Sequence, residues 1–133
     1  MKIKVSEATT VQLDWLVAKC EGHTVEMWHK YKHLRTPQQE LVSLGVSVGE
    51  CDEFGLVGYS PTSEWSQGGP IIEREGINVY QMHDGTWQAN LDYGMIDEAI
   101  YHGPTPLIAA MRCFVASELG DEADVPDELG DQT

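Results

Sequence analysis

The stretch that decides the fold is GPTPLIAAMRCFVASELG, residues 103–120, which carries the clearest helix signal in the chain. Pro104 interrupts any preceding element, Thr105 suits the N-cap, and Pro106 suits the first helical position. Apolar residues then recur with helical spacing at Leu107, Ala110, Met111, Phe114 and Val115. Because Gly120 can end the helix, the pattern predicts an amphipathic helix over about residues 105–119.

A second amphipathic helix is predicted near the N-terminus, over about residues 9–21. Thr9 and Gln12 have the spacing of a capping box, and Gly22 supplies a stop. The apolar positions at helical spacing are Leu13, Leu16, Val17 and Cys20. This arrangement leaves Asp14, Trp15 and Lys19 off the apolar stripe.

Short strands are predicted around these helices. The candidate ranges are 2–5, 24–31, 41–48, 54–59, 77–81, 86–91 and 98–101. Asp84-Gly85 is a strong turn signal and predicts a hairpin of the 77–81 and 86–91 segments. The expected fold is α+β: a small, mainly antiparallel sheet covered by the two amphipathic helices, in a single domain over residues 1–120.

The chain is strongly acidic: it has 8 Lys and Arg residues, 22 Asp and Glu residues and a formal net charge of −14. Seven acids and no bases fall between Glu118 and Thr133, which predicts an acidic tail over residues 121–133. We expect that tail to be poorly ordered, with Val125 and Leu129 as possible anchors. Such a surface repels phosphate backbones, which argues against nucleic-acid binding and favours a positively charged protein partner.

Neither a targeting signal nor a membrane span is indicated. The start, MKIKVSE, lacks the apolar segment of a signal peptide, and the apolar runs are too short to cross a bilayer. The expected location is therefore the cytoplasm, with no membrane partner.

The most suggestive stretch for a binding site is Gln67-Gly68-Gly69-Pro70. Here the sequence predicts a turn-rich loop over residues 60–70, followed by a short helix that covers residues 71–75. Pro70 suits the first position of this helix. Left-handed glycines and free N–H groups at the helix start could hold an anion, while Tyr59 and Trp65 stack on a planar ligand. A purely structural turn is the alternative, and no P-loop is formed because no Lys-Ser/Thr follows. The candidate binding residues are Tyr59, Trp65, Gln67, Gly68, Gly69, Arg74, Trp15 and Lys19.

Catalytic and metal-binding patterns are missing from the sequence. The three cysteines, Cys20, Cys51 and Cys113, form no C-x-x-C pair. His29 and His33 have helical metal spacing, but their segment is predicted as a strand or loop. Because no nucleophile, base and oxyanion site can be assembled, we expect no enzyme and no cofactor.

Several long runs resemble the NinX family of lambda-like phage proteins. They are residues 14–22, 59–75, 103–112, 116–122 and 125–129, whereas residues 23–56 show no clear correspondence. The resemblance implies an accessory early-gene protein expressed in an infected bacterium. It implies no known activity, cofactor or catalytic residue.

The expected function is therefore non-catalytic binding of a host protein, in a host-takeover or defence-modulating role. The main alternative is a small-molecule, nucleotide-like ligand sequestered by the Tyr59-Trp65-Gly69 loop. DNA mimicry by the acidic surface and an unrecognised hydrolase are further alternatives, and the oligomeric state stays open.

Overall fold

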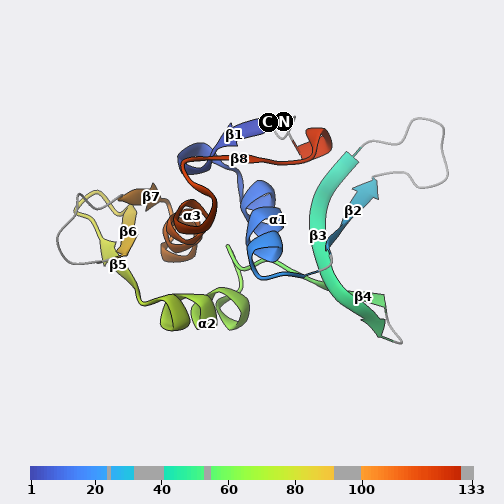
Figure 1. Ribbon diagram of the computed structural model, residues 1–133, viewed down its shortest axis with the longest axis horizontal. Coiled ribbons are helices and arrows are strands. Elements are labelled where there is room, and N and C mark those ends of the chain that lie inside the picture. The colour runs from blue at the N-terminus through green and yellow to red at the C-terminus, as the bar shows by residue number, and fades with distance from the viewer. Residues whose placement is uncertain (24, 32–40, 53–54, 92–99, 130–133) are drawn as a thin grey trace.

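The computed structural model describes residues 1–23, 25–31, 41–52, 55–91 and 100–129, which form an α+β fold. Within those ranges there are three α-helices (Figure 1): α1 (Thr10–Cys20), α2 (Trp65–Glu75) and α3 (Pro106–Leu119). Two short 3-10 helices, Val5–Glu7 and Asp127–Leu129, lie near the two ends. The predicted fold class is confirmed, and α1 and α3 match the two predicted helices closely.

Every strand pairing in the described ranges is antiparallel, as predicted, but the strands divide among three sheets instead of one. One sheet pairs β1 (Lys2–Lys4) with β8 (Glu122–Asp124). A second joins β2 (Val25–Tyr31), β3 (Leu41–Asp52) and β4 (Gly55–Gly58). The third joins β5 (Ile77–Gln81), β6 (Trp87–Leu91) and β7 (Tyr101–Gly103).

The β5–β6 hairpin has the turn that the sequence predicts. Gly85 takes a positive φ of 89°, and the N–H of Met82 donates to the carbonyl of Thr86 at 2.8 Å. The strand predicted over 98–101 instead begins at Tyr101, and residues 98 and 99 lie outside the described ranges.

Helix α1 begins with the predicted capping box. The N–H of Gln12 donates to Thr9 Oγ1 at 3.3 Å, and the N–H of Thr9 donates to Gln12 Oε1 at 2.9 Å. Figure 1 shows α1 between α3 and β3, so the helix is covered on two sides. Asp14, predicted to lie off the apolar stripe, is also buried, with only 7% of its surface exposed, and it contacts Thr62 in the segment before α2.

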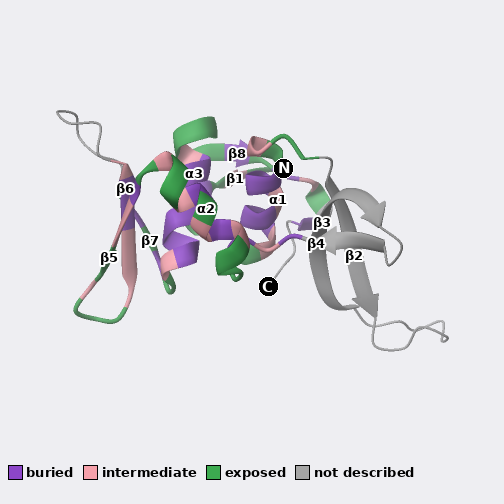
Figure 2. Ribbon diagram, turned by 90° about the horizontal axis from the view of Figure 1, so that it is seen from below, coloured by how far each residue is buried: buried purple, intermediate pink, exposed green. Residues whose placement is uncertain are grey.

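Helix α3 is the centre of the apolar core. Its buried residues include Leu107, Ala109, Ala110, Met111, Phe114 and Val115. Figure 2 shows the buried positions concentrated on α1 and α3. Strand β7 approaches α3 closely at Gly103, where a Cβ would lie 2.7 Å from the backbone nitrogen of Ala109. Glycine is therefore required for this contact.

Helix α2 differs from its prediction. It begins at Trp65 instead of Pro70, and Pro70 lies inside it. Among the described residues, positive φ angles occur at Gly22, Gly76, Gly85 and Gly120, and not at Gly68 or Gly69. The predicted loop over 60–70 with left-handed glycines is therefore wrong in its second half. A Cβ at Gly68 would meet the carbonyl oxygen of Pro61 and lie 2.7 Å from Leu107 Cδ2, so this glycine serves close packing.

The acidic C-terminal segment packs into the body as far as it is described. Strand β8 pairs with β1, and the N–H of Val125 donates to the carbonyl of Met1 at 2.8 Å. Val125 and Leu129 are buried, in agreement with the expected anchors, and Gln12 Nε2 donates to the carbonyl of Leu129 at 2.9 Å. Residues 121–129 thus belong to the packed structure, unlike the separate tail predicted for 121–133. Residues 130–133 lie outside the described ranges.

Candidate functional site

Trp65, the first residue of α2, is the most exposed large apolar side chain in the described ranges, with 57% of its surface accessible. Its ring lies against Gly69, one turn further along the helix, since a Cβ there would be 3.7 Å from Trp65 Cε3. The indole therefore packs on its own helix at Gly69 and leaves most of its surface accessible to solvent.

Further exposed residues share one side of α2 with this indole. At 3.6 residues per turn, Trp65, Ser66, Pro70 and Glu73 fall within less than half of the helix circumference, and all are exposed. Glu64 precedes the helix and is exposed too. Within the described ranges, neither Glu64 nor Glu73 forms an ion pair. We call these five residues the Trp65 surface: an aromatic side chain beside small residues and unpaired carboxylates.

Tyr59 does not join this surface as an exposed stacking partner. It is buried, with 8% of its surface accessible, and its ring meets that of His23 edge-on at a centroid distance of 5.2 Å. Burial, together with the nearby carboxylates of Glu21 and Asp14, raises the pKa of the Tyr59 hydroxyl to about 12. Tyr59 is therefore a neutral core residue.

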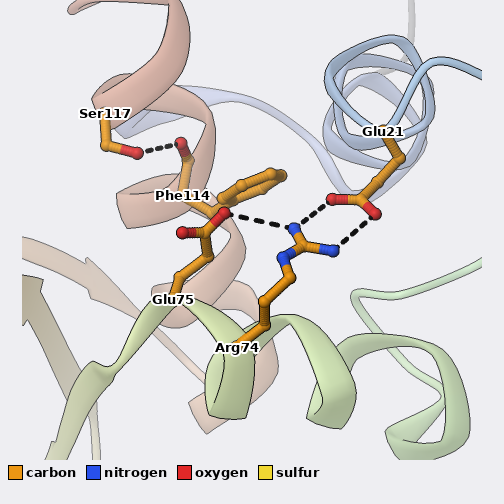
Figure 3. Close-up of polar contacts among 5 residues, drawn as sticks. All are labelled: Glu21, Arg74, Glu75, Phe114 and Ser117. Carbon is orange, nitrogen blue, oxygen red and sulfur yellow. Dashed lines mark hydrogen bonds and ion pairs between the residues drawn. The ribbon is translucent and has the colours of Figure 1, made fainter.

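Arg74 is held by carboxylates from two sides (Figure 3). Its Nη1 donates to Glu21 Oε2 at 2.8 Å, its Nη2 pairs with Glu21 Oε1, and Glu75 Oε1 lies 3.2 Å from Nη2. The guanidinium also lies 5.8 Å from the centre of the Phe114 ring, which it covers. The hydrogen bond from Arg74 lowers the pKa of Glu21. This arginine therefore joins α2 to α1 and α3 and is not an open anion ligand.

The remaining loop candidates also serve local structure. Gln67 Oε1 accepts a hydrogen bond from the N–H of Ser60 at 2.7 Å. The N–H of Gly68 donates to the carbonyl of Glu64 at 2.9 Å. Since that amide is used by the helix, Gly68 offers no free N–H group to an anion.

Trp15 and Lys19 form a pair of their own on α1. The Lys19 ammonium lies 5.5 Å from the centre of the half-buried Trp15 ring, which is a cation–π distance. No hydrogen bond, ion pair or ring contact among the described residues joins this pair to Trp65. The structure therefore shows no direct contact that joins the candidates Trp15 and Lys19 to Trp65.

Asp14 is a polar residue that sequence reasoning did not single out. Its Oδ1 accepts hydrogen bonds from the backbone N–H of Thr62 at 3.1 Å and from the Thr62 hydroxyl at 2.8 Å. Burial raises the pKa of this carboxyl to about 6, although both bonds from Thr62 act in the opposite direction. The contact spans 48 positions of sequence, so no local pattern could have revealed it.

The described residues contain no group of three or more side chains placed to hold a metal ion. His29 lies in strand β2, as its segment predicts, and His33 falls outside the described ranges. Burial raises the pKa of the Cys20 and Cys113 thiols to about 11. Because the thiolate is the reactive form, both are structural cysteines. No described helix is both long and apolar enough to serve as a membrane span.

Comparison with protein families supports the resemblance seen in the sequence. The model of the family described as Bacteriophage P22, NinX matches residues 4–118. The chain belongs to this family. The NinX match runs through residues 23–56, where the sequence alone showed no clear correspondence, and stops before Gly120. No match was found among the curated proteins.

Proposed function

We propose that this NinX-family phage accessory protein acts without catalysis, by binding a protein of its bacterial host through the Trp65 surface. The observation that carries the proposal is the exposed Trp65 indole, supported by Gly69 and 57% accessible. Exposed tryptophans are among the commonest anchors of protein interfaces, because they bury a large area at a small cost in side-chain entropy.

Charge supports a basic partner. The chain carries a formal net charge of −14, and Glu64 and Glu73, on the same side of α2 as the indole, have no ion-pair partners in the described ranges. Complementary charges accelerate association and orient the two proteins. The expected partner therefore offers an apolar recess edged by Lys or Arg side chains, and the encounter takes place in the host cytoplasm.

The nucleotide-sequestering alternative finds less support. Nucleotide binding would need Tyr59 as an exposed ring that stacks on the base, and free glycine N–H groups that bind the phosphate. Tyr59 is buried, and the Gly68 amide bonds within its helix. A thermal-shift series with nucleotides still distinguishes the two functions, because only a sequestering protein would be stabilised.

The test compares immobilised wild-type protein with Trp65→Ala and Tyr80→Ala in a bacterial lysate. Tyr80 is the matched control, since it is an aromatic residue with 47% exposure on strand β5 and is not part of the Trp65 surface. Both substitutions remove exposed side chains, so the free energy of unfolding should change by no more than about 0.5 kcal/mol.

We expect one or a few basic host proteins to be retained by the wild type and Tyr80→Ala and lost with Trp65→Ala. Retention should also fall as salt is raised, because the contact is partly electrostatic. Equal retention by all three proteins would exclude the Trp65 surface as the binding site.

A further inference from the structure

Arg74 shows how this chain binds a guanidinium group. Figure 3 shows the group between the carboxylates of Glu21 and Glu75. Its Nη1 donates to Glu21 Oε2 at 2.8 Å, and Glu75 Oε1 lies 3.2 Å from Nη2. The guanidinium carbon also lies 5.8 Å from the centre of the Phe114 ring, which it covers. Carboxylates and an aromatic ring together therefore hold an arginine side chain in this protein.

The Trp65 surface contains the same kinds of group without a cation. Its indole is 57% accessible, and the exposed carboxylates of Glu64 and Glu73 form no ion pair with any described residue. Glu64 occupies the N-cap of α2, yet its side chain makes no capping hydrogen bond. Its carboxylate is therefore available to a ligand that contacts the neighbouring indole.

Cations cover other aromatic rings of the chain. The Lys19 ammonium lies 5.5 Å from the centre of the Trp15 ring, and Arg74 covers Phe114. In the part of the chain that the structure describes, no Lys or Arg side chain lies over Trp65 in this way. The whole chain has 8 Lys and Arg residues and 22 Asp and Glu residues, so it has few cations of its own to place there.

We propose that the Trp65 surface binds an arginine side chain of the host protein, with the guanidinium group stacked on the indole and hydrogen-bonded to Glu64. This inference rests on the proposed function and names the chemistry of the partner at the same site. Arginine fits the site better than lysine, because its planar group is weakly hydrated, stacks on aromatic rings and donates to a carboxylate through two N–H groups.

Glu73 lies too far from the indole to share the same arginine. It follows Trp65 by eight residues, so the two residues are about 12 Å apart along the axis of α2 at a rise of about 1.5 Å per residue. The partner segment is therefore expected to carry an arginine that contacts Trp65 and Glu64, and a second Lys or Arg that pairs with Glu73.

Fluorine NMR measures binding at the indole directly. The protein contains four Trp residues, and after labelling with fluorotryptophan the signal that is missing from Trp65→Phe belongs to Trp65. The probes are synthetic helical peptides that are identical except at two positions, two helical turns apart. These positions carry arginine, lysine or citrulline, which has nearly the shape of arginine without its charge.

The arginine peptide should shift the Trp65 signal until the site is saturated. It should bind at least about threefold more tightly than the lysine peptide, and the citrulline peptide should cause no shift. A Trp65 signal that does not respond to the arginine peptide would overturn the proposal. Equal affinity for the arginine peptide and either of the other two would overturn it as well.

Matched charge variants separate a local contact from general attraction to an acidic protein. Glu64→Gln and Glu118→Gln each remove one negative charge, but Glu118 is exposed on α3 and is not part of the Trp65 surface. Glu64→Gln should weaken binding of the arginine peptide about two- to fivefold, whereas Glu118→Gln should leave it nearly unchanged. Equal losses in the two variants would mean that net charge alone attracts the peptide, which contradicts the proposal.

The host-protein assay distinguishes this inference from the function on which it rests. Trp65→Leu keeps an apolar side chain but removes the aromatic ring. Loss of the host protein with both Trp65→Leu and Trp65→Ala supports arginine stacking. Retention with Trp65→Leu but not with Trp65→Ala would contradict stacking and leave the proposed function intact. Retention with both variants would exclude the Trp65 surface itself.

Discussion

A single carboxylate oxygen, Asp14 Oδ1, accepts both the backbone N–H and the hydroxyl of Thr62, at 3.1 and 2.8 Å. The bond joins α1 to the segment that leads into α2, three residues before Trp65. The placement of the Trp65 surface therefore depends on a carboxyl group that burial holds at a pKa of about 6.

Replacing this carboxyl by an amide should stabilise the protein at neutral pH. The folded-state pKa of Asp14, about 6, lies above its ordinary value of 3.8, so between these values the folded state binds more protons. The free energy of unfolding contributed by Asp14 therefore falls as pH rises through this window. Asp14→Asn keeps the acceptor for Thr62 without the charge. It should add up to about 3 kcal/mol at pH 8 and little at pH 4, as measured by urea denaturation.

A stabilisation that did not change with pH would show that the charge of Asp14 is not its cause. Thr62→Val provides the complementary variant. It removes the hydroxyl donor and should cost about 1–3 kcal/mol, because the buried acceptor loses a partner.

The two adjacent glycines of α2 should respond oppositely to alanine. Gly68→Ala places a methyl group against the carbonyl oxygen of Pro61 and Leu107, and should cost about 1–3 kcal/mol. Gly69→Ala meets only the Trp65 ring at 3.7 Å, an ordinary contact, and should be neutral or stabilising by up to about 1 kcal/mol. Thermal unfolding of both variants checks the contrast. Equal effects would mean that α2 does not approach Pro61 as closely as described.

Arg74→Met should have a small effect on stability and a clear effect on a neighbouring pKa. The Arg74 side chain is 51% exposed, so its ion pair with Glu21 is screened by water and worth at most about 1 kcal/mol. Methionine still covers Phe114. Without the guanidinium, the pKa of Glu21 should rise towards its ordinary value of 4.5, which an NMR titration of its carboxyl carbon would detect. An unchanged Glu21 titration would disprove the contact.

Leu129→Ala tests whether the C-terminal segment belongs to the packed body. Leu129 is fully buried, so truncation should cost about 2–5 kcal/mol. Glu122→Gln, at an exposed position of β8, is the control and should change stability by less than about 0.5 kcal/mol. Equal urea midpoints for the two variants would show that residues near Leu129 do not contribute to folding.

The sequence correctly predicted the helix starts and the turn that are determined by neighbouring residues. The Thr9–Gln12 capping box, the Thr105–Pro106 start of α3 and the Asp84-Gly85 turn all depend on residues close in sequence. Helix α2 was misplaced because glycine and proline ordinarily interrupt helices. Here Gly68 is needed because the helix packs closely against Pro61. The hydrophobic periodicity of the sequence does not reveal this tertiary contact.

The candidate site was predicted only in part for the same reason. Trp65 and Arg74 were recognised as residue types that bind, but their exposure and partners depend on the tertiary fold. Arg74 is paired with Glu21, 53 positions away, and Asp14 with Thr62, 48 positions away. Neither separation leaves a signature in a single sequence.

The β1–β8 ladder pairs Lys2 with Asp124 and Lys4 with Glu122. A ribosome releases the first of these strands long before it has made the second, so this sheet cannot form during most of translation. Closing so long a loop is also slow. Until Val125 and Leu129 emerge, the newly made chain leaves apolar surface uncovered, and chaperones and proteases have access to it during this interval.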